Sequence, residues 1–464
     1  MLNHFNFKKV SEKIFLLTND FGQYIFLSES EFSLLLTQKV QDGSDLQHQL
    51  KEKLFLLEPM DLFSADIAQR LREIKQYVFA PTSLHIFVVT NTCNLQCVYC
   101  QAQAHKKNNH GYMDRETARK AVDIAIQSPA KNLTFEFQGG EPLLNYPVIQ
   151  EIVSYTESIE HGKNIDFTIV SNLSLLTDDM LDFFIRHKVS ISTSLDGPPE
   201  LHDKNRPPCS GNSSHELLMR AIQRIHERNY SVSGIETTTK QSLAYAREIV
   251  REYVKIGSNG VFIRPLTPLG FAKDEWSRIG YTPEEFLHFY KEAFNEVLAI
   301  NKTGKVFPEQ HAAILLKKIL FGQGINYMDL RSPCGAGIGQ LAYYYDGNIY
   351  TCDEARMVAE SGDLAFLLGH VETSSYRDVV SCDNCKAACA SSVIETLPAC
   401  CDCVYQPYCG VCPVVNYAME GDIFPREMHS YRCRIYSGIL DFLFELLREN
   451  DPSTIQILES WVKR

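Results

Sequence analysis

Between residues 83 and about 300, short apolar stretches alternate with longer amphipathic ones. The short stretches have the continuous hydrophobicity of strands that are buried on both faces of a parallel sheet. Strands are predicted at Leu84–Thr90, Leu133–Gln138, Asp166–Ser171, Val189–Leu195, Val232–Thr238 and Gly260–Arg264. Helices are predicted between them, at Arg115–Gln127, Pro147–Glu160, Thr177–Arg186, His215–Arg228 and Leu243–Val254. Nearly every strand ends on polar side chains, where α/β barrels build their sites, so we expect an α/β fold with a partial (β/α)6 TIM-like barrel rather than a flat sheet.

Three further regions flank this barrel, which we place at residues 81–330. Residues 1–80 are predicted to form a small α+β, winged-helix-like unit that starts with a hairpin of Ile14–Thr18 and Tyr24–Leu27. Three helices follow, at Phe32–Leu36, Leu46 to about Leu54 and Ser64–Tyr77, and Phe32, Leu35 and Leu36 are expected to pack on the hairpin. Residues 331–434 are rich in Cys and Gly, as expected of a region held by metal. Residues 435–464 have a helical pattern.

The cysteines point to metal rather than to disulfides. Three of the fifteen lie at 93–100, one at 209, and the other eleven between 334 and 433. The N-terminus lacks the apolar core of a secretory signal, and no apolar run approaches the roughly 18 residues of a membrane span. A cytoplasmic location without a membrane partner is therefore expected, and disulfides are rare in that reducing compartment. The net charge of −12 argues against nucleic acid as a partner, because phosphates are bound by clustered Lys and Arg.

The first cysteine group follows directly on the first predicted barrel strand. Cys93, Cys97 and Cys100 have the spacing C-x3-C-x2-C, with Tyr99 before the third thiol. Three thiolates can hold three irons of a [4Fe–4S] cluster, which normally takes four protein ligands, and one iron is then left open. The alternative is a zinc site completed by His105 or His110.

This triad resembles the signature of the radical S-adenosylmethionine (SAM) superfamily. In that family, SAM chelates the open iron, and one electron cleaves it to methionine and a 5′-deoxyadenosyl radical. The resemblance extends to Gly139-Gly140-Glu141, which is similar to the motif that binds the SAM amine, although a Gly-Gly turn would look alike. It also implies a ribose contact by Ser171 and Asn172, and a carboxylate contact by Ser194 and Arg206. Cys209 stands alone and is expected to have a structural or incidental role.

The C-terminal cysteines resemble the SPASM extension, which carries auxiliary iron–sulfur clusters in radical SAM enzymes that modify peptides and proteins. The resemblance implies that Cys334, Cys352 and Cys412 hold auxiliary cluster I, with a fourth ligand from Cys382, Cys385 or Cys389 or an open position. It assigns cluster II to Cys400, Cys403, Cys409 and Cys433, with Cys401 as an alternative to Cys400. Here the gap before Cys412 is two residues, where the family has three. Considered alone, the same spacing would also fit a zinc ribbon.

Asp353 follows Cys352 directly, where sulfatase maturases of the superfamily carry a catalytic acid. A carboxylate in that position would accept a proton when a substrate radical is oxidised. The next residues, Glu354-Ala355-Arg356, depart from the sulfatase-maturase pattern, and the alternative is that Asp353 and Arg356 are structural ion-pair groups.

Several longer stretches look like the B-member maturase of the His-Xaa-Ser peptide system, namely 135–145, 329–333, 353–357 and 408–413. This resemblance implies an oxidoreductase that modifies a short ribosomal precursor peptide, a paired second radical SAM protein, and an electron donor such as flavodoxin or ferredoxin. Residues 1–80 would then bind the leader peptide at a free sheet edge, or else only cap the barrel. The alternatives for the whole chain are a maturase of a protein such as a sulfatase, and a zinc-binding scaffold without catalysis.

Overall fold

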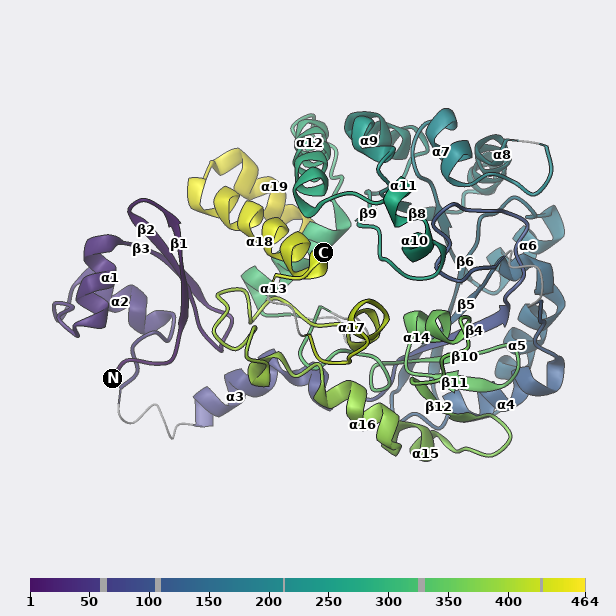
Figure 1. Ribbon diagram of the computed structural model, residues 1–464, viewed down its shortest axis with the longest axis horizontal. Helices are drawn as coiled ribbons and strands as arrows, with labels where there is room; N and C mark the ends of the chain where they lie inside the picture. The colour runs from purple at the N-terminus through teal and green to yellow at the C-terminus, as the bar shows by residue number, and fades with distance from the viewer. Residues whose placement is uncertain (59–64, 105–109, 212, 324–329, 426–428, 464) are drawn as a thin grey trace.

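The computed structural model describes residues 1–463 except 59–64, 105–109, 212, 324–329 and 426–428. The predicted histidine ligand His105 and the motif residue Asp329 lie outside the described residues. Figure 1 shows a small unit at the N-terminus beside a larger body that contains the barrel and the C-terminal region. No helix in the described part of the chain is long and apolar enough to cross a membrane.

The N-terminal unit contains a three-stranded antiparallel sheet in the order β1-β2-β3. Its elements are β1 (Asn6–Ser11), β2 (Ile14–Thr18), β3 (Tyr24–Ser28), α1 (Glu29–Leu36) and α2 (Asp45–Glu52). The hairpin β2-β3 and both helices confirm the sequence prediction, and Ser28 and Glu31 form the capping box that starts α1. Phe32 and Leu35 are buried on the sheet, but Leu36 is 50% exposed because it lies about 100° around the helix from Leu35.

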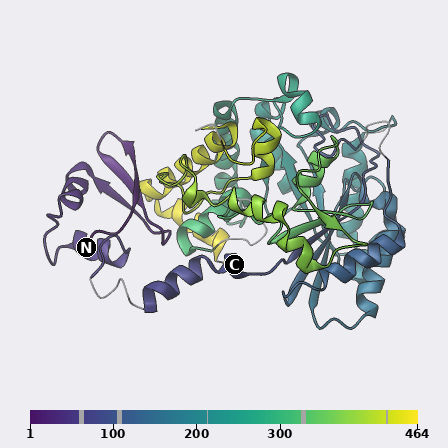
Figure 2. The ribbon, with the colours of Figure 1, turned by 60° about the horizontal axis from the view of Figure 1, so that its bottom comes forward.

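Strand β1 was not predicted, and contacts outside the unit explain why it forms. Its sequence, Asn-Phe-Lys-Lys-Val-Ser, carries two adjacent lysines that hide the alternation of a strand. The Nζ of Lys8 lies 2.6 Å from Oδ1 of Asp441, and Nδ2 of Asn6 donates to the carbonyl oxygens of Cys401 and Cys403. The Oγ1 of Thr18 on β2 likewise donates to the carbonyl of Val404 at 2.7 Å. The unit is therefore docked on the Cys-rich region, and Figure 2 shows the two side by side.

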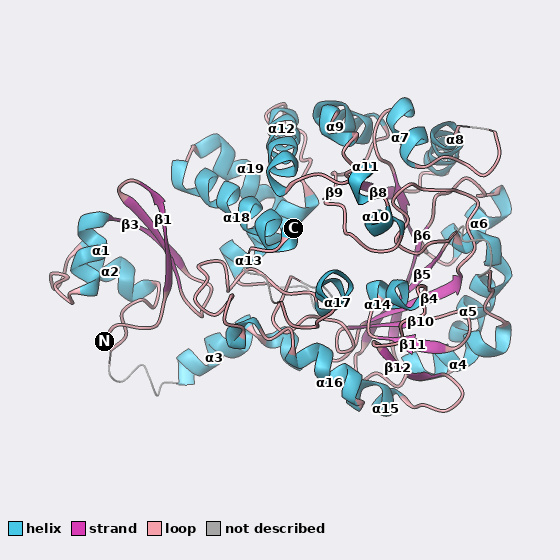
Figure 3. Cartoon of the chain, viewed as in Figure 1, coloured by secondary structure: helices cyan, strands magenta, loops and turns pink. Residues whose placement is uncertain are grey.

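The predicted barrel is present, and its strands run parallel in the order β4-β5-β6-β7-β8-β9. The strands are β4 (Leu84–Thr90), β5 (Asn132–Gly139), β6 (Asn164–Val170), β7 (Ser190–Ser194), β8 (Val232–Thr237) and β9 (Ile263–Arg264). The first helices are α3 (Ala65–Ile74), α4 (Arg115–Ala125), α5 (Tyr146–Ser158), α6 (Asp178–Arg186), α7 (Pro199–Asn205), α8 (Ser214–Glu227) and α9 (Ala246–Lys255). The later ones are α10 (Phe271–Asp274), α11 (Trp276–Ile279), α12 (Pro283–Asn301) and α13 (Gln310–Phe321). Helices α4 to α9 cover the outer side of the sheet (Figure 3), and the alternate strand residues that face them, such as Phe135 and Phe137, are buried in the main core.

The Cys-rich region continues the barrel sheet, which the sequence did not reveal. Strand β10 (Gln340–Tyr343) pairs parallel with β4, and β11 (Asn348–Tyr350) and β12 (Leu367–His370) add antiparallel strands, so the sheet has nine strands. Such strands of three or four residues are too short to show a period, and they form because β4 offers an open edge. The remaining helices are α14 (Asp353–Ala359), α15 (Tyr376–Ser381), α16 (Asp383–Ala390), α17 (Pro413–Glu420), α18 (Tyr431–Glu449) and α19 (Pro452–Val462). The last two confirm the predicted helical C-terminus.

Candidate functional site

The loop that carries the cysteine triad leaves the carboxyl end of β4 and is held from both sides. The backbone N–H of Gln96 donates to Pro207 O at 2.8 Å, and that of Val98 donates to Asn205 O at 2.9 Å. On the other side, Gly270 lies against the loop with φ +53°, and a Cβ there would come within 2.3 Å of Gln101 O. The loop conformation is thus fixed by neighbouring backbone, which positions three thiols on a segment of eight residues.

The glycine pair at the end of β5 packs against the start of this loop. A Cβ on Gly139 would lie 2.3 Å from Thr90 O, and a Cβ on Gly140 would lie 2.3 Å from Thr92 O. The backbone N–H groups of Gly140 and Glu141 donate to these same two carbonyls at 2.8 Å. The close backbone packing at these two positions therefore requires glycine, whether or not the glycines also contact a ligand.

Glu141 joins the ends of β5 and β6. Its carboxylate accepts hydrogen bonds from Ser171 Oγ at 2.6 Å and from the backbone N–H groups of Asn172 and Leu143 at 2.8 and 3.1 Å. Burial raises the pKa of Glu141 to about 7, against the effect of these donors. The structure thus brings together Glu141, Ser171 and Asn172, three residues predicted to contact SAM from two different strands.

Asn172 also connects this network to the first thiol. Its Nδ2 lies 3.9 Å from Cys93 Sγ and donates to Asn94 Oδ1 at 3.0 Å. The Asn94 amide in turn donates to Ser174 Oγ at 2.7 Å. The β6 end therefore fixes the cysteine loop as well as Glu141.

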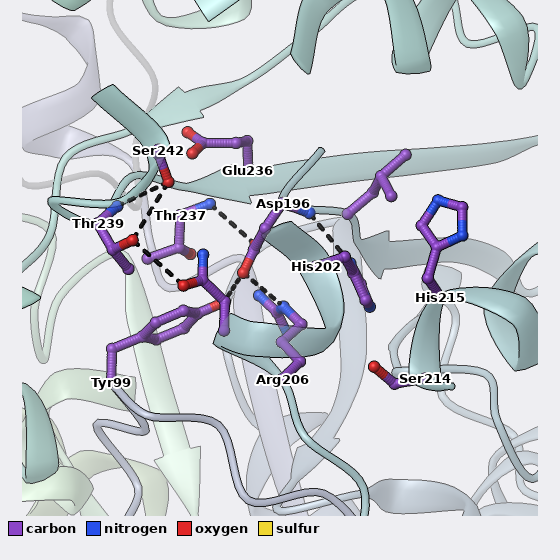
Figure 4. Close-up of polar contacts among 12 residues, drawn as sticks. Tyr99, Asp196, His202, Arg206, Ser214, His215, Glu236, Thr237, Thr239 and Ser242 are labelled. Carbon is purple, nitrogen blue, oxygen red and sulfur yellow. Dashed lines mark hydrogen bonds and ion pairs between the residues drawn. The ribbon is translucent and has the colours of Figure 1, made fainter. Parts of the chain in front are cut away.

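A second buried network lies on the other side of the loop, at the end of β7 (Figure 4). Asp196 is fully buried, accepts a hydrogen bond from Tyr99 Oη at 2.6 Å and lies 3.1 Å from Arg206 Nε. The Arg206 guanidinium stacks 5.2 Å from the centroid of the Tyr99 ring. Burial disfavours the Arg206 cation, but Asp196 outweighs it, and the pKa of Arg206 is raised. Arg206 was expected to hold a carboxylate of SAM, and in this structure the Asp196 carboxylate is its partner, while Ser194 lies two residues before Asp196.

The three thiols lie within electrostatic range of one another and of two arginines. Burial raises the pKa of Cys93, Cys97 and Cys100, that of Cys97 to about 12, and the charge of Arg206 acts in the opposite direction on Cys97. Arg206 and Arg356 both lower the pKa of Cys100. Buried thiols of this kind stay protonated unless a metal displaces the proton, and the flanking cations favour an anionic thiolate site. The donor set therefore fits three ligands of an iron–sulfur cluster.

Ten of the eleven C-terminal cysteines separate into three groups. Cys334, Cys352 and Cys412 are buried in one core cluster, and the pKa of Cys352 is raised by burial, then by Glu354, and then by the other two thiols. Cys400 lies within range of Cys409, Cys403 and Cys433, in that order of strength, and burial with these neighbours raises its pKa to about 12. These two groups of thiols have the same members as the ligand sets assigned to auxiliary clusters I and II. That assignment stays a prediction.

The remaining cysteines are outside the two assigned ligand sets, although Cys401 also lies within electrostatic range of Cys400. Cys382, Cys385 and Cys389 lie on or next to α16, and a Cβ on Gly337 would be 2.7 Å from Cys385 Sγ, so Cys385 touches the loop after Cys334. Cys401 Sγ contacts Pro398 O at 3.8 Å, and Cys209 is exposed.

Within the described residues, no three or more side chains of His, Cys, Asp or Glu converge closely enough to bind a metal ion as they stand. His110, named in the zinc alternative, has its Nδ1 3.3 Å from Thr92 Oγ1.

Helix α14 reaches from the Cys-rich region into the barrel. Arg356 is 1% exposed; its Nε donates to Asp353 Oδ1 at 2.8 Å and its Nη2 lies 3.4 Å from Gly139 O. Glu354 pairs with Arg264 at the end of β9, with a distance of 3.3 Å from Oε1 to Nη2. The segment after Cys352 thus contacts strands β5 and β9, and the ion pair between Asp353 and Arg356 expected from the sequence is present.

Comparison with known proteins gives a family match for part of the chain. The sequence model of the radical SAM superfamily matches residues 87–251. An uncharacterized protein of Methanocaldococcus jannaschii is 30% identical over 183 residues, which are 39% of this chain. The match spans 62% of that protein, which is less than two thirds of its length. The cysteine-type anaerobic sulfatase-maturating enzyme of Clostridium perfringens is 25% identical over 283 residues, 59% of this chain and 74% of that enzyme.

Two solved structures share the fold over most of both chains. Native anSMEcpe with bound AdoMet and Kp18Cys peptide aligns with a TM-score of 0.68 at 20% identity, over 82% of this chain and 99% of that one. Streptococcus suis SuiB bound to precursor peptide SuiA aligns with a TM-score of 0.53 at 12% identity, over 92% and 98%. Residues 87–251 therefore form a radical SAM domain with an α/β fold and a mostly parallel sheet, which this chain combines with a Cys-rich C-terminal region.

Proposed function

We propose that this protein is a radical SAM oxidoreductase that modifies a ribosomally made precursor peptide, of the His-Xaa-Ser type. The observation that supports radical SAM activity is the position of three thiols at the carboxyl end of β4. They lie between the Glu141 network and the Asp196–Arg206 pair. Sites of α/β barrels lie at this end of the strands. The radical SAM match covers the same residues.

The bound groups are assigned to residues as follows. The [4Fe–4S] cluster that binds SAM would be held by Cys93, Cys97 and Cys100. One or two auxiliary clusters would be held by Cys334, Cys352, Cys412, Cys400, Cys403, Cys409 and Cys433. Gly139, Gly140 and Glu141 would hold the SAM amine, Ser171 and Asn172 the ribose, and Ser194 and Arg206 the carboxylate. When bound, these groups supply one-electron cleavage of SAM to a radical that takes a hydrogen atom from the substrate.

The protein's own side chains would then orient SAM and move a proton. Glu141 joins the ends of β5 and β6, and its carboxylate would accept a hydrogen bond from the amine of SAM. Asp353 lies 2.8 Å from the Arg356 guanidinium, and we assign it the proton that the substrate loses. The cysteine loop is held by backbone contacts to Asn205 and Pro207, which fixes the direction of the three thiols.

A peptide substrate is supported by the N-terminal unit. Its strands β1 and β3 are each paired on one side only among the described residues, so each leaves an edge to which an extended leader could add as a further strand. SuiB, which shares the fold, has been solved with its precursor peptide SuiA. A paired second radical SAM protein and an electron donor such as flavodoxin or ferredoxin complete the proposal.

The second candidate is maturation of a protein substrate. It is favoured by the sulfatase-maturating enzyme of Clostridium perfringens, which matches 59% of this chain. Mass spectrometry of a candidate precursor peptide, co-expressed with and without this protein, decides between the two. A peptide whose mass does not change, beside a sulfatase that acquires its modification, would favour the second.

Anaerobically purified protein is expected to be brown and to contain roughly 8 to 12 irons with matching sulfide, from two or three [4Fe–4S] clusters. The reason is that ten of the fifteen cysteines are assigned as ligands and lie in groups of three, three and four. Iron, zinc and acid-labile sulfide are measured on the same sample. About one zinc without sulfide would identify the protein as a zinc-binding scaffold instead.

Replacing Glu141 by glutamine is expected to weaken SAM binding roughly 10- to 100-fold, because the amine N–H groups of SAM lose a charged acceptor. Glutamine keeps one acceptor oxygen for Ser171 and Leu143 but places an NH2 group opposite the Asn172 N–H, so the free energy of unfolding should fall, though by less than in Glu141→Ala. Glu141→Ala is the control: it should weaken binding similarly and also lower the free energy of unfolding, by about 1–3 kcal/mol for each donor left without an acceptor. Equilibrium binding of SAM and chemical denaturation measure the two effects. An unchanged SAM affinity in Glu141→Gln would remove this residue from the site.

A further inference from the structure

The interior of the barrel contains a carboxylate that the proposed function does not use. Glu136 lies on β5, three residues before Gly139, with Phe135 and Phe137 as its neighbours. These two phenylalanines are buried against the outer helices, so Glu136 faces the opposite side of the sheet. Its register partner on β4 is Ile86, which packs with Cys352 and Ala355 in the second core cluster. Glu136 therefore points into the barrel, toward α14.

The surroundings of Glu136 are polar. Gln138, the next residue on the same face, donates its Nε2 to Glu136 Oε1 at 2.5 Å. On the other side, the register partner on β6 is Thr168, which is itself opposite Ser190 on β7. Asp353 of α14 lies within electrostatic range and adds a second negative charge. Burial raises the pKa of Glu136 to about 7, the Gln138 amide opposes this effect, and Asp353 adds to it.

Among the described carboxylates next to α14, Glu136 is the one without a cation. Asp353 is neutralised by Arg356 and Glu354 by Arg264, at 2.8 and 3.3 Å. Glu136 forms no ion pair with the described residues, and it is only partly buried, so it is open to a bound molecule. A half-buried carboxylate is stabilised when a cationic N–H donor pairs with it, and such charge-assisted hydrogen bonds are stronger than neutral ones.

We propose that Glu136 selects the substrate, by pairing with a side chain that carries a basic nitrogen, an imidazolium, ammonium or guanidinium group, when that side chain enters the barrel. The position suits this role, because Glu136 lies three residues before Gly139 on the strand that carries the proposed amine site. Asp353 lies within electrostatic range of Glu136. Gln138 orients the carboxylate through Oε1 and leaves Oε2 for the substrate. This inference names the substrate class of the proposed peptide-modifying activity and rests on it.

The test uses the full-length, cluster-loaded protein with SAM, a reductant and capped pentapeptides Gly-Gly-X-Gly-Gly. X is His, Lys or Arg, and the neutral comparisons are Gln and norleucine. Formation of 5′-deoxyadenosine is measured against peptide concentration, which gives kcat and KM for each peptide. At least one basic peptide is expected to stimulate the reaction with a KM roughly 10-fold or more below that of the norleucine peptide, and to lose this preference in Glu136→Gln through KM rather than kcat. Comparing His, Lys and Arg identifies the preferred basic group.

Asp166→Asn is the matched control, because Asp166 lies on the same face of β6 toward the opposite end of the strand and is exposed. This variant removes the same charge and should keep the preference for the basic peptide. Equal KM values for basic and neutral peptides in the unmodified protein, including no response to any of them, would overturn the inference. The same preference in Glu136→Gln as in the unmodified protein would overturn it too, since a purely structural Glu136 would change stability and not selectivity. If the iron-loaded protein forms no 5′-deoxyadenosine even without peptide, the proposed function itself fails.

Discussion

Replacing Cys93, Cys97 and Cys100 together by alanine is expected to abolish 5′-deoxyadenosine formation and to remove about four irons, while the C-terminal iron remains. The physical reason is that the three thiols lie on one short loop fixed by β4 and by the 205–208 segment, whereas the other assigned ligands lie in the Cys-rich region. Iron and sulfide content, electron paramagnetic resonance of the reduced protein and product analysis are measured on the same preparation.

Cys209→Ala provides the control for that experiment. Cys209 is exposed, and its backbone N–H donates to Asn94 O at 3.1 Å, so it sits beside the loop without being one of the three thiols. The substitution leaves this backbone contact intact, and both iron content and product formation should stay as in the unmodified protein. Continued 5′-deoxyadenosine formation by the triple variant would refute the assignment of the triad.

Deleting residues 1–80 is expected to reduce kcat/KM for a full-length precursor roughly 100-fold or more, because a bound leader raises the effective concentration of the core peptide at the barrel. SAM cleavage without peptide should continue, and a high precursor concentration should partly restore modification. Mass spectrometry of the precursor over a range of concentrations, together with 5′-deoxyadenosine analysis, measures both effects.

The docking of this unit makes a second variant necessary. The deletion also removes the partners of Asp441 and of the carbonyls of Cys401 and Cys403, and this alone would disturb the proposed ligand region. The double variant Asn6→Ala, Lys8→Ala breaks these contacts but keeps the sheet, since its side chains do not form the β1–β2 backbone pairing. If the unit recognises the leader, the double variant should retain most of the precursor affinity. If a well-folded deletion variant modifies the precursor with an unchanged apparent affinity, leader recognition by this unit is wrong.

Local sequence determined the barrel. Strand β4 was predicted at its observed bounds, and β5 to β8 within two residues at each end, because buried parallel strands are continuous apolar runs ended by polar residues or glycine. The starts of α4, α5, α6 and α8 were predicted within one residue, whereas α1 begins at Glu29, three residues before the predicted Phe32. The cysteine spacing indicated an iron–sulfur site for the same reason: ligands on one loop are local in sequence.

Tertiary structure decided what depends on residues far apart in the chain. Strands β1 and β10 to β12 are short or carry charges, and they exist because partners at Asp441, at the carbonyls of Cys401 and Cys403 and at β4 complete them. The sequence does not show which anion pairs with Arg206, and in the folded protein its partner is Asp196. The sequence shows Glu136 only as a polar residue between two phenylalanines. Its direction into the barrel and its lack of a cation follow from the register with β4 and from the ion pairs of α14, because side-chain facing and charge pairing are set when distant segments pack.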